Sequence, residues 1–414
     1  MTSTRPSVEN GGERKRAALA FVVMMGLVSL FADACYEGMR SAVGPYLAHL
    51  GASATAVGIV AGSGELVGYG LRYLTGRIAD RTRAYWALTI IGYSTNLVAV
   101  PLLAVAGSWQ AVAALIVLER LGKAIRNPAR STILSFAAAE LGHGKSFALH
   151  EAMDQLGAVI GPLSVGAVLW WRGDGLEGYQ WAFVLLGIPA LLSILTLLTA
   201  RARVPDPRSL APASEADARA TLGRPFTLYL VGVALVGFGL ADWALLAFHL
   251  QSRDVLAGAL LPVVYAAAMA ADGGAALLVG GAFDRARARG GTGLVVLAAA
   301  LVLSAASLPL VLLGGVPAAL AGIALWAVGL GATESIGKAT VAILSPPSRR
   351  ATAYGAYYLV FGAAWWLGSI LIGVLSDHSR VAASAFGVVS LLLAAAVMVA
   401  ADRAARSTTT VASR

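Results

Sequence analysis

Three charged residues stand at helical spacing inside an otherwise apolar stretch near the start of the chain. Asp33, Glu37 and Arg40 are separated by four and then three residues, so a helix places all three on one face. Two carboxylates one turn apart repel each other when both are ionised, so one is expected to hold a proton near neutrality. Such a group suits a proton-coupled carrier. A static ion pair between Glu37 and Arg40 that only orients helices is the alternative.

A second charged cluster opens another apolar segment and contains His150, Glu151 and Asp154. His150 and Asp154 are four residues apart and share a helix face. The pattern H-E-x-x-D resembles the H-E-x-x-H helix of zinc proteases, but no third ligand follows, so no metal is expected. We expect this cluster to pair with cations of the preceding apolar segment, namely Arg120, Lys123 or Arg126. Such a network could gate the cytoplasmic side of the protein or bind substrate.

Further charged side chains fall inside apolar segments, where each costs at least about 2.5–3.5 kcal/mol on insertion scales and is a candidate for function. They are Glu65, Arg72, Asp242, His249, Asp272, Glu334 and Lys338. Glu334 and Lys338 are four residues apart and could neutralise each other. Glu65, Asp242 and Asp272 are further candidates for the proton site or the substrate cavity.

An aromatic stripe lies near the end of the chain. Tyr354, Tyr358, Phe361 and Trp365 share one helical face. Tyrosine hydroxyls in the middle of a membrane need hydrogen-bond partners, which favours a polar cavity for Tyr354, Tyr358 and Phe361. An aromatic belt at the membrane interface is the alternative.

The elements that position these residues follow from the composition. The chain of 414 residues is 58% hydrophobic and only 13% charged, whereas soluble domains carry about 25% charged residues. The apolar residues form continuous blocks long enough to cross a hydrocarbon layer of about 30 Å, so we expect transmembrane helices rather than a barrel. Twelve spans are predicted, at 17–47, 55–75, 84–106, 109–130, 146–170, 179–201, 225–250, 257–282, 292–314, 317–343, 351–375 and 381–402.

The net charge of +9 is a topology signal. If alternate connections face opposite sides, only three of the 31 Lys and Arg, namely Arg172, Arg253 and Arg380, lie on the side away from the N-terminus. Eight lie inside the predicted spans, and the remaining 20 lie on the N-terminal side. The positive-inside rule then places both termini in the cytoplasm. We expect the membrane to be the inner membrane of the cell. No nucleic-acid partner is expected. Residues 1–16 are polar and the first apolar block is too long for a cleavable signal peptide.

Two short motifs occur twice at matching places. G-x-x-x-D-R follows the second span as Gly76, Asp80 and Arg81 and follows the eighth as Gly280, Asp284 and Arg285. E-x-x-G-K begins at Glu119 in span four and at Glu334 in span ten. The chain therefore reads as a six-helix unit used twice, with halves at 1–202 and 225–414. The polar stretch 203–224 reads as a cytoplasmic linker.

These motifs resemble those of the major facilitator superfamily over the whole chain. The G-x-x-x-D-R pattern is similar to the signature of that family, and Arg120 resembles its span-four arginine. Gly157, Gly161 and Pro162 in span five resemble the G-x-x-x-G-P motif of its antiporter branch. The resemblance implies an all-α fold with twelve transmembrane helices in two pseudo-symmetric halves, and a secondary transporter rather than an enzyme.

The motifs also have physical roles. A glycine such as Gly76 lets two helices approach closely, and we expect G-x-x-x-D-R to form a turn in which Asp80 accepts from a neighbouring helix N-terminus. Arg81 can bind carboxylates or lipid phosphate. Breaking such contacts would let the two halves rock. A purely structural turn is the alternative.

The function predicted from the sequence is proton-coupled efflux of a small solute by alternating access. Proton-coupled uptake by a symporter is the alternative, and a membrane sensor or a metalloprotease on a polytopic scaffold is a remote one. No phosphate-binding G-x-x-x-x-G-K-[ST] loop occurs, so ATP is not the expected energy source. The expected partners are a small-molecule substrate, protons and membrane lipid. We expect a monomer with no cofactor.

Overall fold

The computed structural model describes residues 9–141, 143–206, 223–289, 292–345 and 350–412, and these residues form helices joined by short connections. The α-helices are α1 (Glu9–His49), α2 (Ala54–Thr82), α3 (Tyr85–Leu102), α4 (Trp109–Leu141), α5 (His143–Arg172), α6 (Leu176–Leu185), α7 (Gly187–Arg203), α8 (Arg224–Gly239), α9 (Trp243–Ser252), α10 (Leu261–Ala288), α11 (Leu294–Ser304), α12 (Ser307–Leu313), α13 (Val316–Leu344), α14 (Arg350–His378) and α15 (Arg380–Ala412). Two short 3₁₀ helices complete the described elements: η1 (Leu103–Val105) directly follows α3, and η3 (Gly258–Leu260) directly precedes α10.

These helices make twelve passages through the bundle, which confirms the predicted all-α fold. Three passages consist of two helices each, namely α6 with α7, α8 with α9, and α11 with α12. Eleven of the passages, counted over the described residues, are long and apolar enough to cross a membrane. The exception is α4, which carries charged residues from Glu119 to Arg130. It packs against α2 and α3 inside the bundle. The protein is a multi-pass membrane protein.

The predicted span 225–250 matches the seventh passage, but this passage is not one continuous helix. The helix α8 ends at Gly239, and the chain is extended at Leu240 and Asp242 before α9 begins. The Asp242 side chain accepts a hydrogen bond from the Ala244 backbone N–H at 2.9 Å. An aspartate in this conformation is a favoured N-cap, so it starts a new helix. The carboxylate is thereby fixed at a helix break in the middle of the membrane.

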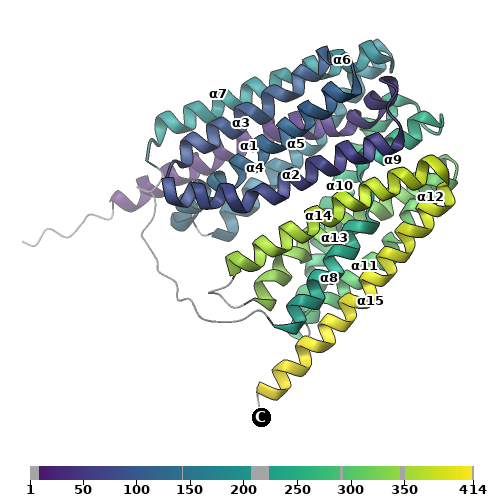
Figure 1. Cartoon of the computed structure of the whole chain (residues 1–414). Helices are drawn as coiled ribbons and strands as arrows, with labels where there is room; N and C mark the ends of the chain where they lie inside the picture. Colours follow the sequence, from purple (N-terminus) through teal and green to yellow (C-terminus); the bar gives the residue numbers. More distant parts are fainter. Residues whose placement is uncertain (1–8, 142, 207–222, 290–291, 346–349, 413–414) are drawn as a thin grey trace, which may run out of the picture.

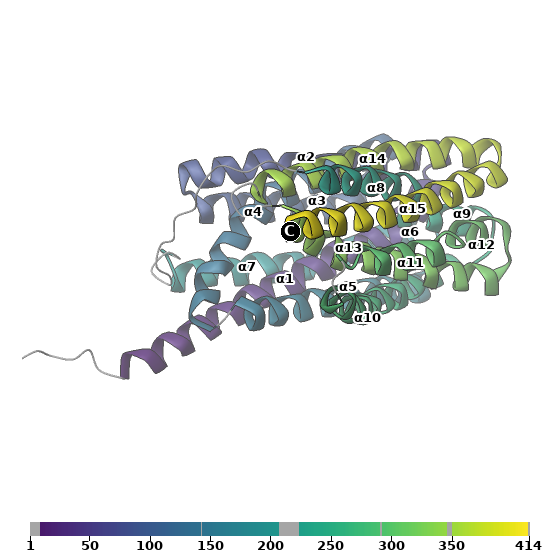
Figure 2. The same ribbon diagram turned by 90° about the horizontal axis from the view of Figure 1, so that it is seen from below.

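Two bundles make up the molecule (Figure 1). The helices α1 to α7 form one, and α8 to α15 form the other. We call the end where α1 begins and α15 ends the terminal side, and the opposite end, with the α5–α6 and α14–α15 connections, the distal side. The bundles converge on the distal side and diverge toward the terminal side in Figure 1, and Figure 2 shows the same bundles from below. Most of the predicted linker 203–224 lies outside the described residues.

The two bundles touch mainly along three helix pairs, α2 with α14, α1 with α9, and α5 with α10, with smaller contacts of α2 with α9 and of α1 with α10. The most extensive of these contacts is between α2 and α14. A Cβ atom at Gly58 would overlap the backbone carbonyl of Ser369, so only glycine allows the two backbones to come this near. Trp243 of α9 adds a hydrogen bond from its indole N–H to the Ser41 carbonyl of α1 at 3.2 Å.

Two carboxylates on the distal side link one bundle to a helix start in the other. Asp377, at the end of α14, accepts from the backbone N–H groups of Ala54 and Thr55 at 3.0 and 2.9 Å and from the Thr55 hydroxyl at 2.5 Å. Asp174, just after α5, accepts from the Gly258 N–H at 2.8 Å. Each acid lies at the distal end of the fifth passage of its own half, Asp377 in the last turn of α14 and Asp174 just after α5, and caps the second passage of the other half. We call this pair the distal clamp.

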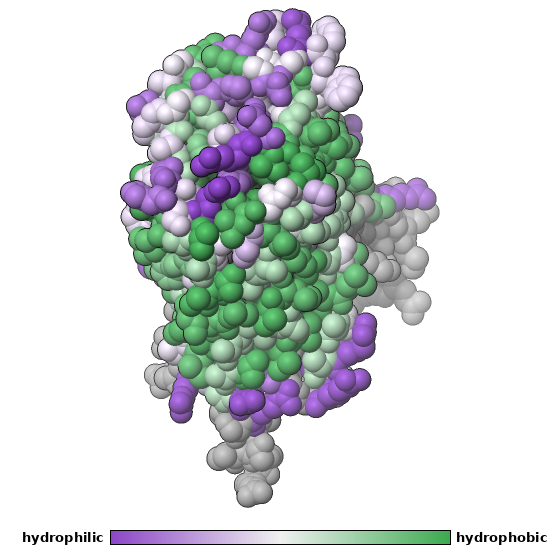
Figure 3. Space-filling view, turned by 90° about the vertical axis from the view of Figure 1, so that its right-hand side faces the viewer, coloured by the Kyte–Doolittle hydropathy of each residue, from purple (hydrophilic) through white to green (hydrophobic). Residues whose placement is uncertain are grey.

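The surface between the two ends is apolar. Figure 3 shows a broad hydrophobic region with hydrophilic residues gathered at its edges. Large apolar side chains are openly exposed, for example Leu277 at 81% and Trp170 at 80%. Exposed apolar area on this scale is the surface that lipid covers in a membrane protein.

Candidate functional site

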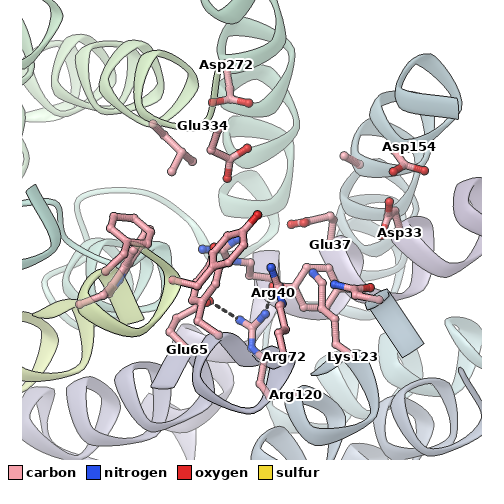
Figure 4. A pocket seen from close by; sticks show the side chains of 18 of the residues that line it. Asp33, Glu37, Arg40, Glu65, Arg72, Arg120, Lys123, Asp154, Asp272 and Glu334 are labelled. Carbon is pink, nitrogen blue, oxygen red and sulfur yellow. Dashed lines mark hydrogen bonds and ion pairs between the residues drawn. The ribbon is translucent and has the colours of Figure 1, made fainter. Parts of the chain in front are cut away.

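A cavity of about 260 Å³ lies between the two bundles. Its described lining comes from α1, α2, α4, α5, α10, α13 and α14, and twelve of the lining side chains are charged (Figure 4). They are Asp33, Glu37, Arg40, Glu65, Arg72, Arg120, Lys123, Arg126, Arg130, Asp154, Asp272 and Glu334. The six cations all come from the first half, whereas two of the six acids, Asp272 and Glu334, come from the second.

The charged stripe of α1 faces this cavity, as its helical spacing predicted. Glu37 accepts a hydrogen bond from the Tyr265 hydroxyl of α10 at 2.5 Å. Arg40 lies 3.5 Å from Asp242 at the α8–α9 break. The ion pair between Glu37 and Arg40 considered above is therefore not formed. Both side chains bind residues of the other half, so the stripe joins the two bundles.

A buried ionic network surrounds Arg120 on α4. Its guanidinium lies 2.8 Å from the Glu65 carboxylate of α2 and 3.4 Å from that of Glu119. It also donates to the Tyr36 hydroxyl of α1, and Asn96 of α3 donates to Glu119. The sequence offered no partner for Glu65 on its own helix. The partner comes from α4, because α2 and α4 pack side by side at this depth.

The partner of Arg120 is not one of the acids expected on span five, because Arg120 binds Glu65 of α2. His150 lies 3.8 Å from Asp154, as helical spacing predicted, and 3.2 Å from the Ser29 hydroxyl. The cation beside His150 is Arg130, whose guanidinium donates a hydrogen bond to the same Ser29 hydroxyl at 2.8 Å. Asp154 lines the cavity, on the same side as Asp33 (Figure 4). The Glu151 side chain lies outside the described residues.

The cationic face of α4 is the main feature that sequence reasoning missed. Arg120, Lys123, Arg126 and Arg130 follow one another at spacings of three, three and four residues and line the same cavity. Lys123 Nζ lies 3.4 Å from the centre of the Tyr36 ring, and the Arg126 guanidinium lies 4.2 Å from that of Tyr93. The spacing of these cations was visible in the sequence, but they were treated as ion-pair partners rather than as a cavity wall.

The second half contributes acids and aromatic rings. Asp272 of α10 is buried, and its carboxylate lies against α13, where a Cβ at Gly331 would be 2.9 Å from it. Across the cavity from Arg72 and Lys123, Figure 4 shows Asp272 with Glu334.

The aromatic stripe of α14 is partly as expected. Tyr358, Phe361 and Trp365 line the cavity, together with Tyr357, whereas Tyr354 is not among the lining residues. Trp365 is only 2% exposed, so it does not belong to a belt at the membrane interface. Tyr357 stacks on Phe361 with ring centres 6.0 Å apart. The rings form an apolar wall beside the charges.

The expectation that G-x-x-x-D-R forms a turn is wrong. Gly76, Asp80 and Arg81 lie in the last turns of α2, and Gly280, Asp284 and Arg285 lie in those of α10. Nothing in the motif stops a helix, and α2 ends only where Arg83 takes a left-handed conformation. Arg81, Asp284 and Arg285 are exposed. The Asp80 side chain lies outside the described residues.

The glycines of span five pack α5 against α1. A Cβ at Gly157 would overlap the Leu30 carbonyl, and one at Gly161 would overlap that of Ala34. Pro162 lies within α5, which continues to Arg172. Close backbone packing therefore accounts for the glycines.

Among the described residues, no group of three His, Cys, Asp or Glu side chains is placed to hold a metal ion. Cys35 is buried. The charged groups of the cavity can bind and release ions or protons.

The chain is similar in sequence to proteins of other organisms. An uncharacterized protein of Mycobacterium tuberculosis is 40% identical over 415 residues, covering 98% of this chain and 96% of its own. An uncharacterized protein of Mycobacterium bovis matches to the same extent. An uncharacterized MFS-type transporter of Methanocaldococcus jannaschii is 27% identical over 193 residues, 46% of each chain.

Solved structures share the fold at low identity. A mutant of the nucleoside transporter NupG superposes with a TM-score of 0.74 at 13% identity, covering 91% of this chain and 99% of that one. A bacterial homolog of the human lysosomal transporter Spinster superposes with a TM-score of 0.70 at 17% identity, covering 92% and 96%. The sequence model of the Major Facilitator Superfamily matches residues 22–368. The chain therefore belongs to the Major Facilitator Superfamily and is a secondary transporter rather than an enzyme.

Proposed function

We propose that this transporter moves a small, charged organic solute out of the cell in exchange for protons. The observation that carries the proposal is the cavity between the two halves, with its twelve charged lining side chains. Charged side chains inside a membrane are costly, so they are usually kept there for a function such as binding substrate or ions. A site between two halves that can rock apart is what alternating access requires.

Proton coupling is proposed at Asp33 and Glu37. Glu37 already binds Tyr265 of the other half at 2.5 Å. When Glu37 is ionised, this hydrogen bond is charge-assisted and strong, and protonation weakens it. The proton occupancy of Glu37 would thereby alter the contact between the halves, which links proton binding to the conformational equilibrium. Asp33 lies one turn away and shares the cavity.

The terminal side is proposed to be cytoplasmic, in an inner membrane, because 20 of the 31 Lys and Arg lie outside the predicted spans on this side and only three on the other. The halves 1–202 and 225–414 would then rock about the cavity while 203–224 connects them, and Arg81 and Arg285 would contact lipid headgroups. Protease protection of tags at both ends tests this topology. A tag digested from outside intact cells would refute it.

Exchange rather than symport is proposed from Gly157, Gly161 and Pro162, which resemble the antiporter motif. Their packing against α1 supports this by keeping the first and fifth passages together while the halves move. Under antiport, an acidic lumen drives solute into inside-out vesicles. Accumulation driven only by an acidic exterior of right-side-out vesicles would instead indicate symport.

The test uses purified protein in vesicles, solutes screened with and without a pH gradient, and proton flux recorded with a dye. Asp33→Asn and Glu37→Gln should abolish accumulation driven by the gradient and preserve downhill exchange. Glu177→Gln removes an exposed acid outside the cavity and should change neither. If both cavity variants still concentrate solute from a pH gradient, this stripe does not couple protons.

A further inference from the structure

Four cations of the cavity have no carboxylate within ion-pair distance in the described parts of the chain. They are Arg72, Lys123, Arg126 and Arg130. The other two lining cations are matched, since Arg40 faces Asp242 and Arg120 faces Glu65. The unmatched four gather on α4 and the adjoining part of α2, so one wall of the cavity carries the excess positive charge.

Arg126 shows the imbalance most clearly. It is 1% exposed, yet its Nε and one terminal nitrogen have no hydrogen-bond partner. The Nε of Arg130 and the Nε of Arg72 are also buried without one. The flat faces of Arg126 and Arg72 rest on the rings of Tyr93 and Tyr69, which holds the guanidinium groups in place while the nitrogens named above keep no hydrogen-bond partner.

A buried guanidinium with free N–H groups favours an anion. Leaving such donors unsatisfied carries their full desolvation cost, and a carboxylate or phosphate oxygen removes it through charge-assisted hydrogen bonds. Arginine holds such groups bidentately, while Lys123 adds a point charge beside them. The α4 wall is therefore built to receive the acidic group of a ligand.

The opposite wall has the reverse character. Asp272 and Glu334 lie across the cavity from Arg72 and Lys123 (Figure 4), and the described lining of α10, α13 and α14 contains no cation. The side chain of Lys338, which was expected to pair with Glu334, lies outside the described residues. A ligand with an acidic group on α4 would present its other end to these two acids. A volume of about 260 Å³ lies just below the usual range of about 300–1,000 Å³ for small-molecule sites. The ligand is therefore small.

We propose that the substrate is a small zwitterion, with its carboxylate or phosphate on Arg126, Lys123 and Arg130 and its ammonium group facing Asp272 and Glu334. This inference rests on the proposed transport function and specifies the class of solute. The two ends of the ligand would contact different halves. Only a ligand that carries both charges could then draw the acidic and basic walls together.

The test measures thermal stabilisation of the purified full chain by a matched series of probes. The series is glycine, 4-aminobutyrate and 6-aminohexanoate. Hexanoate, hexylamine and neutral hexanamide are controls with the six-carbon chain of 6-aminohexanoate. A ligand that binds only the folded state raises stability according to its concentration and affinity. At least one of the amino acids should bind about tenfold or more tightly than each control that lacks one charge.

Variants of the two cavity walls test which end of the ligand each wall binds. Arg126→Gln should remove binding of the zwitterion and of hexanoate, whereas Glu334→Gln should make the amino acid bind no better than hexanoate. Arg289→Gln and Glu177→Gln, at exposed positions outside the cavity, are the matched controls. If Arg126→Gln does not fold, Arg126→Lys and Lys123→Gln report on the same wall with less disturbance.

Equal binding of hexanamide or hexylamine, or stabilisation by no member of the series at millimolar concentration, overturns the zwitterion proposal. The vesicle screen separates this failure from failure of the transport function. A neutral or purely cationic solute that is carried against its gradient by protons would uphold transport and refute the substrate class. Absence of any proton-coupled flux would refute the function itself.

Discussion

Neutralising the distal clamp should shift this transporter toward a state that is open on its distal side. Asp377→Asn and Asp174→Asn keep the shape of each side chain and one acceptor oxygen but remove the negative charge from two helix starts. In the structure described here these carboxylates hold the second passage of each half to the fifth passage of the other. Both contacts must break before the distal side can separate.

The size of the shift follows from the geometry. Asp377 accepts three hydrogen bonds, but it is exposed, so solvent reduces its contribution to about 1 kcal/mol, typical of a charge at a helix N-terminus. Asp174 is half-buried and accepts one bond, which is worth about 1 kcal/mol. The two acids share no partner, so their effects should add. About 2 kcal/mol corresponds to a change of about 30-fold in the conformational equilibrium.

The shift can be read as a distance between two spin labels on the distal side. Gly107 follows η1 in the first half and Gly315 follows α12 in the second, and a Cβ at either meets no atom within 4 Å. The only native cysteine, Cys35, is buried, so labels at Gly107→Cys and Gly315→Cys report cleanly. Each single variant should populate a longer distance, and the double variant more so.

Asp254→Asn is the matched control, because Asp254 is an exposed acid between α9 and η3, in the same connection as Gly258. It should leave the distance distribution unchanged. A double Asp174→Asn/Asp377→Asn protein that folds normally and keeps the short distance would refute the assignment of these acids as a clamp.

Two further predictions concern packing inside the first half. Glu65→Gln leaves the buried Arg120 with Glu119, at 3.4 Å, as its one remaining carboxylate partner among the described residues and should destabilise the protein by about 3 kcal/mol in thermal unfolding; the double variant with Arg120→Gln should recover much of this loss, and a double-variant loss equal to the sum of the two single-variant losses would show that the pair is not coupled. Gly161→Ala forces a Cβ against the Ala34 carbonyl and should cost about 1–3 kcal/mol; Gly274→Ala, where a Cβ meets nothing within 4 Å, should be neutral, and equal stability of the two variants would contradict the packing of α5 on α1.

Local patterns predicted the fold well. Continuous apolar runs located the passages, and the spacing of Asp33, Glu37 and Arg40 correctly placed them on one face. The break in the seventh passage was missed, although Gly239 and the N-capping Asp242 are both signs of a helix boundary. A hydropathy window averages over such residues, so it does not detect a helix break within a long apolar run.

Partners across helices could not be predicted. Arg120 had candidate acids on α5 and binds Glu65 on α2, and Arg40 had Glu37 one turn away and binds Asp242 in the other half. These choices depend on which helices are neighbours at a given depth, which a single sequence does not encode locally. The cavity wall on α4 was hidden for a related reason, because cations in a membrane span were read as parts of ion pairs.

The charge carried by α4 also has a consequence for biogenesis. As it leaves the ribosome, this segment is the passage least able to enter the bilayer alone, since each Arg or Lys at a span centre costs about 2.5–3.5 kcal/mol on the insertion scale. The groups that compensate it are on earlier passages: Glu65 on α2, and the rings of Tyr36 on α1 and Tyr93 on α3. The first three passages must therefore be assembled beside the translocon when α4 emerges. Insertion of the fourth passage depends on helices made before it.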